Sequence, residues 1–152
     1  MKIGVISDTH GLMRPEALTA LGGSDLIIHA GDVGSPAILE SLATIAPVVA
    51  VRGNNDTGTW ARNLPKTEVI QAGTRSIYLL HNADELDIDP VSAGYRVVVS
   101  GHSHRPAQRE QAGVLYLNPG SAGPRRFKLP VAVARLQIDR TRIRVEIVEL
   151  HV

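Results

Sequence analysis

The chain contains a series of short apolar segments, most of which end in a carboxylate, an amide or an imidazole. Residues 2–8, 25–32, 47–53 and 95–101 each contain a short apolar stretch of Val, Ile, Leu or Ala. Runs of this length are typical of strands that are covered on both faces. This pattern favours a layered fold in which buried strands present polar side chains at their ends.

Helical patterns separate the first three of these strands. Residues 14–21 predict a helix, because Pro15 suits its first turn and Gly22 its exit. Residues 35–44 predict a second helix that begins after Ser35 as the N-cap. Strands that alternate with helices at this spacing indicate parallel strand–helix–strand units.

The second half of the chain has a different pattern. A hairpin is expected from the alternating segments 66–73 and 75–82, which flank a Gly-Thr turn. A short helix is expected near 86–94, and further strands over 114–120, 130–138 and 142–150. The order predicts an α/β sandwich of two mixed sheets with helices outside, formed by one domain over residues 1–152.

Composition narrows the functional classes. The formal net charge of +1 and the 3% aromatic content give no basic groove or stacking platform for nucleic acid. The sequence contains no cysteine, so disulfides and thiolate metal sites are excluded. No segment reaches the roughly 20 apolar residues of a membrane span, and the first residues lack a signal-peptide core. We therefore expect a cytoplasmic protein with no membrane partner.

The polar side chains after the strands form a chemically matched set. Each alone is more often a turn residue, a helix cap or a hydrogen-bonded core histidine than a functional group. Ligands of open α/β sheets, however, bind at the C-terminal ends of the strands. The set consists of Asp8, His10, Asp32, Asn54, His81, His102 and His104.

Imidazole combined with carboxylate suits divalent transition metals. Seven such ligands are too many for one ion, so we expect two ions that share one carboxylate. Two ions roughly 3.5–4 Å apart can clamp a phosphoryl group and activate water. We expect manganese first, with nickel, cobalt, iron or zinc as alternatives.

The ordered segments "ISDTHG", "IIHAGD", "VRGNND", "SGHSHRP" and "LNPGSAGPRR" resemble those of the calcineurin-like metallophosphoesterases. The resemblance covers nearly the whole chain and fits best the small bacterial and archaeal phosphodiesterase branch (the YfcE type). It implies a four-layer αββα sandwich. It also implies a phosphodiesterase that hydrolyses small or nucleotide phosphoesters by in-line attack of a hydroxide bridging two metals.

The resemblance also implies roles by position. The first metal would be bound by Asp8, His10, Asp32 and His104. The second would be bound by Asp32, Asn54, His81 and His102, so that Asp32 bridges the two ions. All seven positions are therefore candidate metal-ligating and catalytic residues.

The sequence departs from the family in two places. Many relatives carry a histidine that assists the leaving group where this chain has Asn55. Asn82 and Ala83 follow His81 where the family commonly has glycine and histidine. Without a general acid, substrates with good leaving groups should be favoured.

Three alternatives remain open at this point. The enzyme could be a phosphomonoesterase of the same fold, or the chain could be a non-catalytic scaffold like the retromer subunit that shares this fold. A nuclease is the third, and the near-neutral charge counts against it. The expected partner is a small phosphoester substrate, with a homo-oligomer as a possibility.

Several other polar residues invite a structural interpretation. His29 lies within a strand, where a buried, hydrogen-bonded residue that supports the site is expected. Asp56 could orient Asn54 or serve as a turn acid. The loop with Asn118 and Ser121 is expected beside the metal site, and from it Arg125 or Arg126 could reach a substrate phosphate.

Overall fold

The computed structural model describes all 152 residues and contains two five-stranded sheets. Sheet A has the order β10-β9-β1-β2-β3, in which β1, β2 and β3 run parallel and β9 runs antiparallel to both of its neighbours. Its strands are β1 (Lys2–Ile6), β2 (Leu26–His29), β3 (Val48–Ala50), β9 (Ala132–Ile138) and β10 (Ile143–Glu149).

Sheet B repeats this plan with a parallel centre and antiparallel edges. Its order is β4-β5-β6-β8-β7, with β5, β6 and β8 parallel and β4 and β7 antiparallel to their neighbours. Its strands are β4 (Thr67–Ala72), β5 (Arg75–Leu80), β6 (Tyr95–Val99), β7 (Ala107–Gln111) and β8 (Val114–Asn118). Both sheets are therefore mixed, as the sequence predicts.

The two sheets pack face to face over the main hydrophobic core. Val5 and Ile28 of sheet A and Leu79 and Val99 of sheet B are fully buried in one cluster. These residues alternate along their strands with residues that face outward, which is the two-residue period of a strand. The parallel strands of both sheets are thereby fixed relative to each other.

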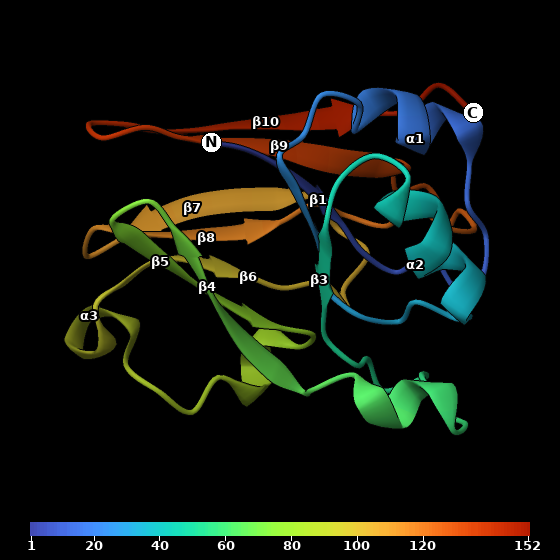
Figure 1. Cartoon of the computed structure of the whole chain (residues 1–152), viewed down its shortest axis with the longest axis horizontal. Coiled ribbons are helices and arrows are strands. Elements are labelled where there is room, and N and C mark those ends of the chain that lie inside the picture. The colour runs from blue at the N-terminus through green and yellow to red at the C-terminus, as the bar shows by residue number, and fades with distance from the viewer.

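Helices complete the layers unequally (Figure 1). Helices α1 (Pro15–Ala20) and α2 (Pro36–Ala43) cover the outer face of sheet A in a second buried cluster. The outer face of sheet B has a smaller cover. Helix α3 (Pro90–Ala93) lies against β6, and Leu86, which follows the short 3₁₀ turn η2 (Ala83–Glu85), packs on a small buried cluster of this face. A further 3₁₀ turn, η1 (Trp60–Asn63), follows β3. The four-layer αββα arrangement is confirmed, with a thin fourth layer.

Most of the predicted elements lie where the sequence places them, and the exceptions have physical causes. Strand β7 was not predicted, because its residues Ala107–Gln111 are all exposed at a sheet edge and carry no apolar pattern. The helix expected near 86–94 is one turn of four residues, Pro90–Ala93, that ends at Gly94 with φ 81°. Exposure thus removes the sequence pattern of β7, and the left-handed Gly94 ends α3 after one turn.

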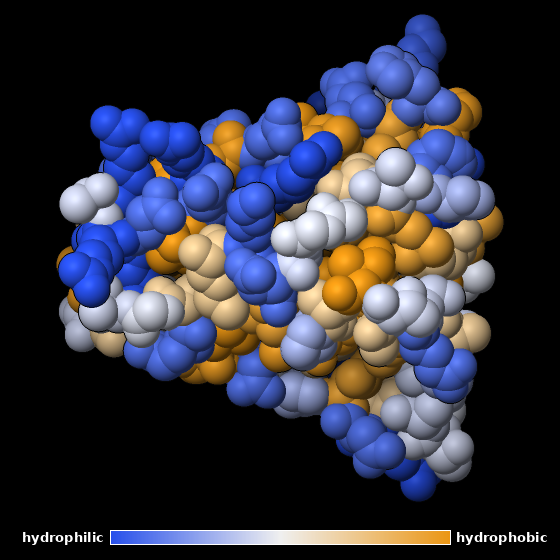
Figure 2. All heavy atoms as spheres, turned by 45° about the horizontal axis from the view of Figure 1, so that its top comes forward, coloured by the Kyte–Doolittle hydropathy of each residue, from blue (hydrophilic) through white to orange (hydrophobic).

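The surface mixes hydrophilic and hydrophobic patches without one continuous apolar face in the view of Figure 2. Strand β10 has one solvated face, since Arg144 and Glu146 are exposed while Val145 packs inward. No helix has the length and the apolar character that crossing a membrane requires.

Candidate metal centre

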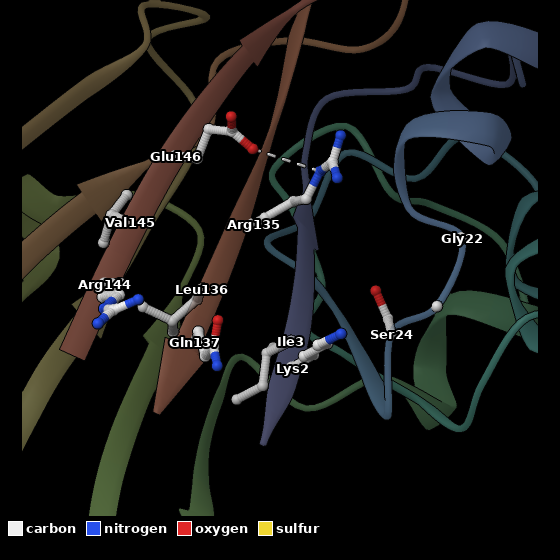
Figure 3. Close-up of a pocket in the computed structure, with 11 residues that line it drawn as sticks. Lys2, Ile3, Gly22, Ser24, Arg135, Leu136, Gln137, Arg144, Val145 and Glu146 are labelled. Atoms are coloured by element: carbon white, nitrogen blue, oxygen red, sulfur yellow. Dashed lines mark ion pairs between the residues drawn. The ribbon is translucent and has the colours of Figure 1, made fainter. Parts of the chain in front are cut away.

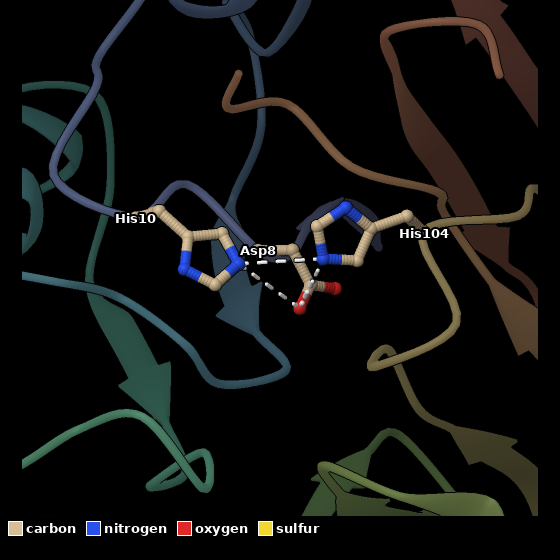
Figure 4. A group of neighbouring side chains, drawn as sticks. All are labelled: Asp8, His10 and His104. Atoms are coloured by element: carbon tan, nitrogen blue, oxygen red, sulfur yellow. Dashed lines mark hydrogen bonds and ion pairs between the residues drawn. The ribbon is translucent and has the colours of Figure 1, made fainter. Parts of the chain in front are cut away.

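All seven predicted ligands lie in loops that follow parallel strands, and the fold brings them together. The first group consists of Asp8 and His10, after β1, and His104, after β6 (Figure 4). Their potential ligand atoms all lie within 4.8 Å of one another. Asp8 Oδ1 is 3.4 Å from His104 Nε2 and 3.9 Å from His10 Nε2. This group, the Asp8 group, therefore joins side chains of both sheets.

The second group consists of Asp32, after β2, and His81 and His102, after β5 and β6. Asp32 Oδ2 is 3.3 Å from His81 Nε2. Asn54 Oδ1, after β3, lies 3.0 Å from His81 Nε2 and 3.2 Å from His102 Nδ1. This group, the Asp32 group, also joins the two sheets.

The two groups are neighbours. His10 Nε2 lies 3.7 Å from Asp32 Oδ2, and His81 Nε2 lies 4.0 Å from Asp8 Oδ1. Each carboxylate is thus within reach of histidines of both groups. The side chains thus fall into the two groups that the sequence resemblance implies.

The ligand loops adopt an unusual backbone conformation. Seven non-glycine residues of the chain have a positive φ, and five of them are predicted ligands. Those five are Asp8 (55°), His10 (47°), Asp32 (54°), His102 (71°) and His104 (62°). A left-handed conformation costs a non-glycine residue about 1 kcal/mol. Contacts around the site must therefore hold these loops in place.

Two glycines before ligands are explained by close packing. A Cβ at Gly53 would overlap Asp32 Oδ1, and a Cβ at Gly101 would overlap Ser7 Oγ. Glycine is therefore required before Asn54 and before His102, because another loop packs closely against the backbone there.

Buried polar side chains orient Asp8 and the loops beside it. The Ser7 hydroxyl donates to Asp8 Oδ2 at 2.8 Å, and the His102 amide donates to the same oxygen at 3.0 Å. The Ser121 hydroxyl donates to the Asp8 carbonyl at 3.0 Å, and Asn118 Nδ2 donates to the Gly101 carbonyl at 2.9 Å. The loop with Asn118 and Ser121 therefore lies beside the site, as expected.

Asp32 is held by Asn55, whose role the sequence did not suggest. The Asn55 amide donates to Asp32 Oδ1 at 2.9 Å, and Asn55 Nδ2 donates to Asp32 Oδ2 at 3.1 Å. Asp56 accepts three backbone N–H groups, from Val33, Gly34 and Gly53. Of the two expectations for Asp56, its contacts match the turn acid, because it links the loops after β2 and β3.

The donor set fits a bound cation. Asp8 Oδ1 is buried and has no hydrogen-bond donor, although three imidazoles surround it. His81 Nδ1 donates to the Ala30 carbonyl at 2.7 Å, so the Nε2 lone pair of neutral His81 faces the oxygens of Asp32 and Asn54. Lone pairs that converge without a proton between them repel one another, and a cation removes that repulsion.

The pKa directions agree with this electrostatic picture. Burial by itself lowers the pKa of His81, but its hydrogen bonds with Asp32 and Ala30 raise that pKa above the ordinary value. Burial by itself raises the pKa of Asp32, but the hydrogen bonds from His81 and Asn55 hold it well below its ordinary value. In the absence of a metal, the site therefore favours a protonated, positively charged His81 beside the Asp32 carboxylate.

Some polar residues have roles other than those suggested by the sequence. Arg125 does not reach the site, because its guanidinium donates to the carbonyls of Leu129 and Val152. Asn82 caps η2 by accepting the Asp84 amide at 3.0 Å, which explains the departure from the family pattern after His81.

A cleft of about 390 Å³ opens beside the Asp32 group. Asn54, His81 and His102 form part of its lining, together with charged side chains from three segments. Those charged residues are Arg52, Lys66, Glu85 and Asp87.

Another hollow, of about 480 Å³, lies on sheet A and contains none of the predicted ligands (Figure 3). Its lining includes Lys2, Ser24 and Arg144, and Arg135 there forms an ion pair with Glu146 at 3.6 Å. Of these two cavities, only the cleft beside the Asp32 group is lined by candidate metal ligands.

Known proteins share this sequence pattern and fold. Residues 1–141 match the calcineurin-like phosphoesterase superfamily domain. A probable metallophosphoesterase of Methanothermobacter thermautotrophicus is 37% identical over 160 residues, covering 97% of this chain and 92% of that protein.

Solved structures share the fold at lower identity. One is a novel archaeal phosphodiesterase with a TM-score of 0.80 and 23% identity, covering 97% of this chain and 100% of that one. Another is Vps29 from Entamoeba histolytica complexed with zinc, with a TM-score of 0.75 and 24% identity, covering 98% and 99%.

Proposed function

Because this chain belongs to the calcineurin-like phosphoesterase superfamily, we propose that it is a phosphodiesterase that uses two divalent metal ions. The observation that carries the proposal is the convergence of unpaired lone pairs in two adjacent groups, above all at buried Asp8 Oδ1. The substrate is a small or nucleotide phosphoester.

The two groups divide the ligands between the ions. The Asp8 group would hold one ion, and the Asp32 group with Asn54 would hold the other. Asp32 would serve both ions, because its Oδ2 also approaches His10 of the Asp8 group at 3.7 Å. When bound, the two ions supply a nucleophile from water at neutral pH and neutralise the charge on the phosphoryl oxygens.

The protein side chains keep this site pre-organised. Asn55 fixes both oxygens of Asp32, and the Ala30 carbonyl fixes the ring of His81. Ser7 fixes Asp8 in the same way. Ligands whose orientation is set before the metal binds need little reorganisation during the reaction.

The site offers no proton donor at the position of Asn55. Its side-chain amide is occupied with Asp32, and an amide cannot act as a general acid at neutral pH. Esters whose leaving group departs as an anion should therefore react fastest. Manganese is the first choice of metal, and nickel, cobalt, iron and zinc suit the same mixed imidazole and carboxylate ligands.

The cleft beside the Asp32 group receives one substituent of the ester. Arg52 and Lys66 line it and form no ion pair with Glu85 or Asp87, which line it as well. The hydrogen bond from the Arg52 amide to the Pro65 carbonyl brings the two cationic residues together. A substituent with polar or anionic groups suits this cleft better than an apolar one.

The test is a metal-reconstituted activity screen. Metal-free protein is loaded with Mn²⁺, Zn²⁺ or Mg²⁺ and offered bis(p-nitrophenyl) phosphate and p-nitrophenyl phosphate. We expect diester hydrolysis that depends on the metal, is highest with a transition metal and is abolished by a chelator. Faster turnover of the monoester would favour the phosphomonoesterase alternative. Two bound ions without hydrolysis of either ester would favour the scaffold.

A series of aryl phosphodiesters tests the leaving-group expectation. We expect the rate to fall steeply as the pKa of the leaving phenol rises, because no side chain protonates it. A flat dependence would reveal a general acid and contradict the role assigned to Asn55.

A further inference from the structure

His29 is a fully buried histidine that lies next to the metal centre without facing it. It ends β2, and its ring makes two hydrogen bonds, one toward each neighbouring ligand loop. Its Nδ1 accepts the Gly31 amide at 3.1 Å, and its Nε2 lies 3.0 Å from Thr9 Oγ1. Thr9 separates Asp8 from His10, and Gly31 precedes Asp32.

The partners define the protonation state of His29. An amide can only donate, so Nδ1 carries a lone pair. The Thr9 hydroxyl donates its hydrogen to the Val33 carbonyl at 2.7 Å, so its oxygen accepts the proton on His29 Nε2. A neutral ring with its proton on Nε2 satisfies every partner. In line with this, burial lowers the pKa of His29 to about 4.

This chain of hydrogen bonds runs alongside a backbone pairing of the same two loops. The amides of Asp8, His10 and Gly11 donate to the carbonyls of Gly31, Asp32 and Val33 at 3.0, 2.9 and 2.9 Å. Asp8, His10 and Asp32 all have positive φ angles in this stretch. The pairing thus holds together the strained residues that contribute to both ligand groups.

We propose that His29, with Thr9, is a positioning residue that fixes the Asp8–His10 loop against the Gly31–Asp32 loop and thereby sets the separation of the two metals. The inference rests on the proposed function, since it requires two ions. His29 touches neither ion nor substrate. It acts through the backbone of the residues that bind them.

Variants of Thr9 give the cleanest test. Thr9→Val keeps the shape of the side chain but leaves the His29 Nε2 proton without an acceptor, whereas Thr9→Ser keeps the hydroxyl. Variants of His29 separate its two contacts. His29→Asn keeps an acceptor near Nδ1 for the Gly31 amide, and His29→Gln keeps a donor near Nε2 for Thr9.

Three readouts are measured on full-length protein. Calorimetry with Mn²⁺ gives the number and affinity of bound ions, and electron paramagnetic resonance reports whether two Mn²⁺ ions are magnetically coupled. Amide hydrogen exchange of residues 8–10 and 31–33 in metal-free protein reports loop opening without any metal. Ile138→Val, in the sheet core at the far end of β9, is the control for a general loss of stability.

We expect Thr9→Val to weaken Mn²⁺ binding about tenfold, to lose the coupled signal and to speed exchange in both loops. Thr9→Ser should restore all three, and Ile138→Val should change none of them. His29→Asn and His29→Gln should each fall between wild type and Thr9→Val, because each keeps one contact.

The inference is overturned if Thr9→Val keeps coupled ions and slow exchange while the wild type shows two coupled ions. It is also overturned if Ile138→Val has the same effects as Thr9→Val. A wild-type protein that binds no coupled pair would contradict the proposed function instead, and the inference with it.

Discussion

The two ligand groups are built from the same kinds of side chain but differ in exposure. In the Asp8 group, Asp8 and His104 are buried, and only the His10 side chain is partly exposed, at 24%. In the Asp32 group, Asp32 and His81 are buried, but His102 and Asn54 are exposed and line a cleft.

This difference in exposure indicates that the two groups have different roles. A buried carboxylate without a donor, Asp8 Oδ1, favours a firmly held cation. Ligands that border a cleft leave room for exchange and for a substrate. We therefore interpret the Asp8 group as the tighter binding site and the Asp32 group as the one that meets the ester.

Removal of the Asp32 carboxylate, which the two groups share, should affect both groups. Asp32→Ala should abolish binding of both ions and reduce diester turnover by at least about 10²-fold, because each ion loses a charged ligand. Calorimetry with Mn²⁺ and a turnover assay would measure this. Asp139→Ala, in the β9–β10 turn, is the matched control and should leave both unchanged. An Asp32→Ala protein with full turnover would disprove the shared role.

The stability of the metal-free protein should depend on pH through His29, which connects loops of both groups. The pKa of His29 is about 4 in the folded protein and about 6.5 in the unfolded chain, so the unfolded state binds more protons in between. Stability should therefore fall by about 3 kcal/mol as the pH decreases from 6.5 to 4.

Urea unfolding of metal-free wild type and His29→Gln over this pH range isolates that contribution. The free energy of unfolding should fall more steeply for the wild type, because glutamine does not titrate. Parallel pH dependences would show that His29 is not a buried neutral base.

Matched histidine variants sharpen the contrast in burial. His104→Ala should lower the free energy of unfolding of the Mn²⁺-loaded protein by about 2 kcal/mol more than His102→Ala, because His104 is buried beside Asp8. His102→Ala should act mainly on turnover. Equal losses of stability would mean that the two groups do not differ in the way proposed.

The smallest effect is expected in the cleft. Arg52→Gln and Lys66→Gln should raise KM for a diester with an anionic substituent about threefold and leave kcat and metal content unchanged. Arg142→Gln, near the β9–β10 turn, is the control. A change in kcat would place these residues closer to the reaction than the cleft suggests.

The sequence predicted the strands of the core and the set of candidate ligands from local patterns. Apolar runs such as residues 95–101 identify buried strands, and a parallel strand places the residues after it at a shared edge. The order of the elements predicted the two sheets, whereas the grouping of the candidate ligands came from the family resemblance.

Other features could not be read from local sequence. The exposed edge strand Ala107–Gln111 lacks an apolar pattern, and the orienting role of Asn55 requires knowledge of where Asp32 lies. The left-handed backbone of five candidate ligands gives no sequence signal, since none of the five is glycine. The edge strand, the role of Asn55 and the left-handed backbone all depend on contacts between segments that are distant in the sequence.

The central claim is that both sheets contribute ligands to a pair of neighbouring cations. The most direct test is anomalous diffraction from a crystal grown with Mn²⁺. We predict two peaks roughly 3.5–4 Å apart, one beside Asp8, His10 and His104 and the other beside Asp32, His81 and His102. A map with one peak, or with none at these side chains, would contradict the account.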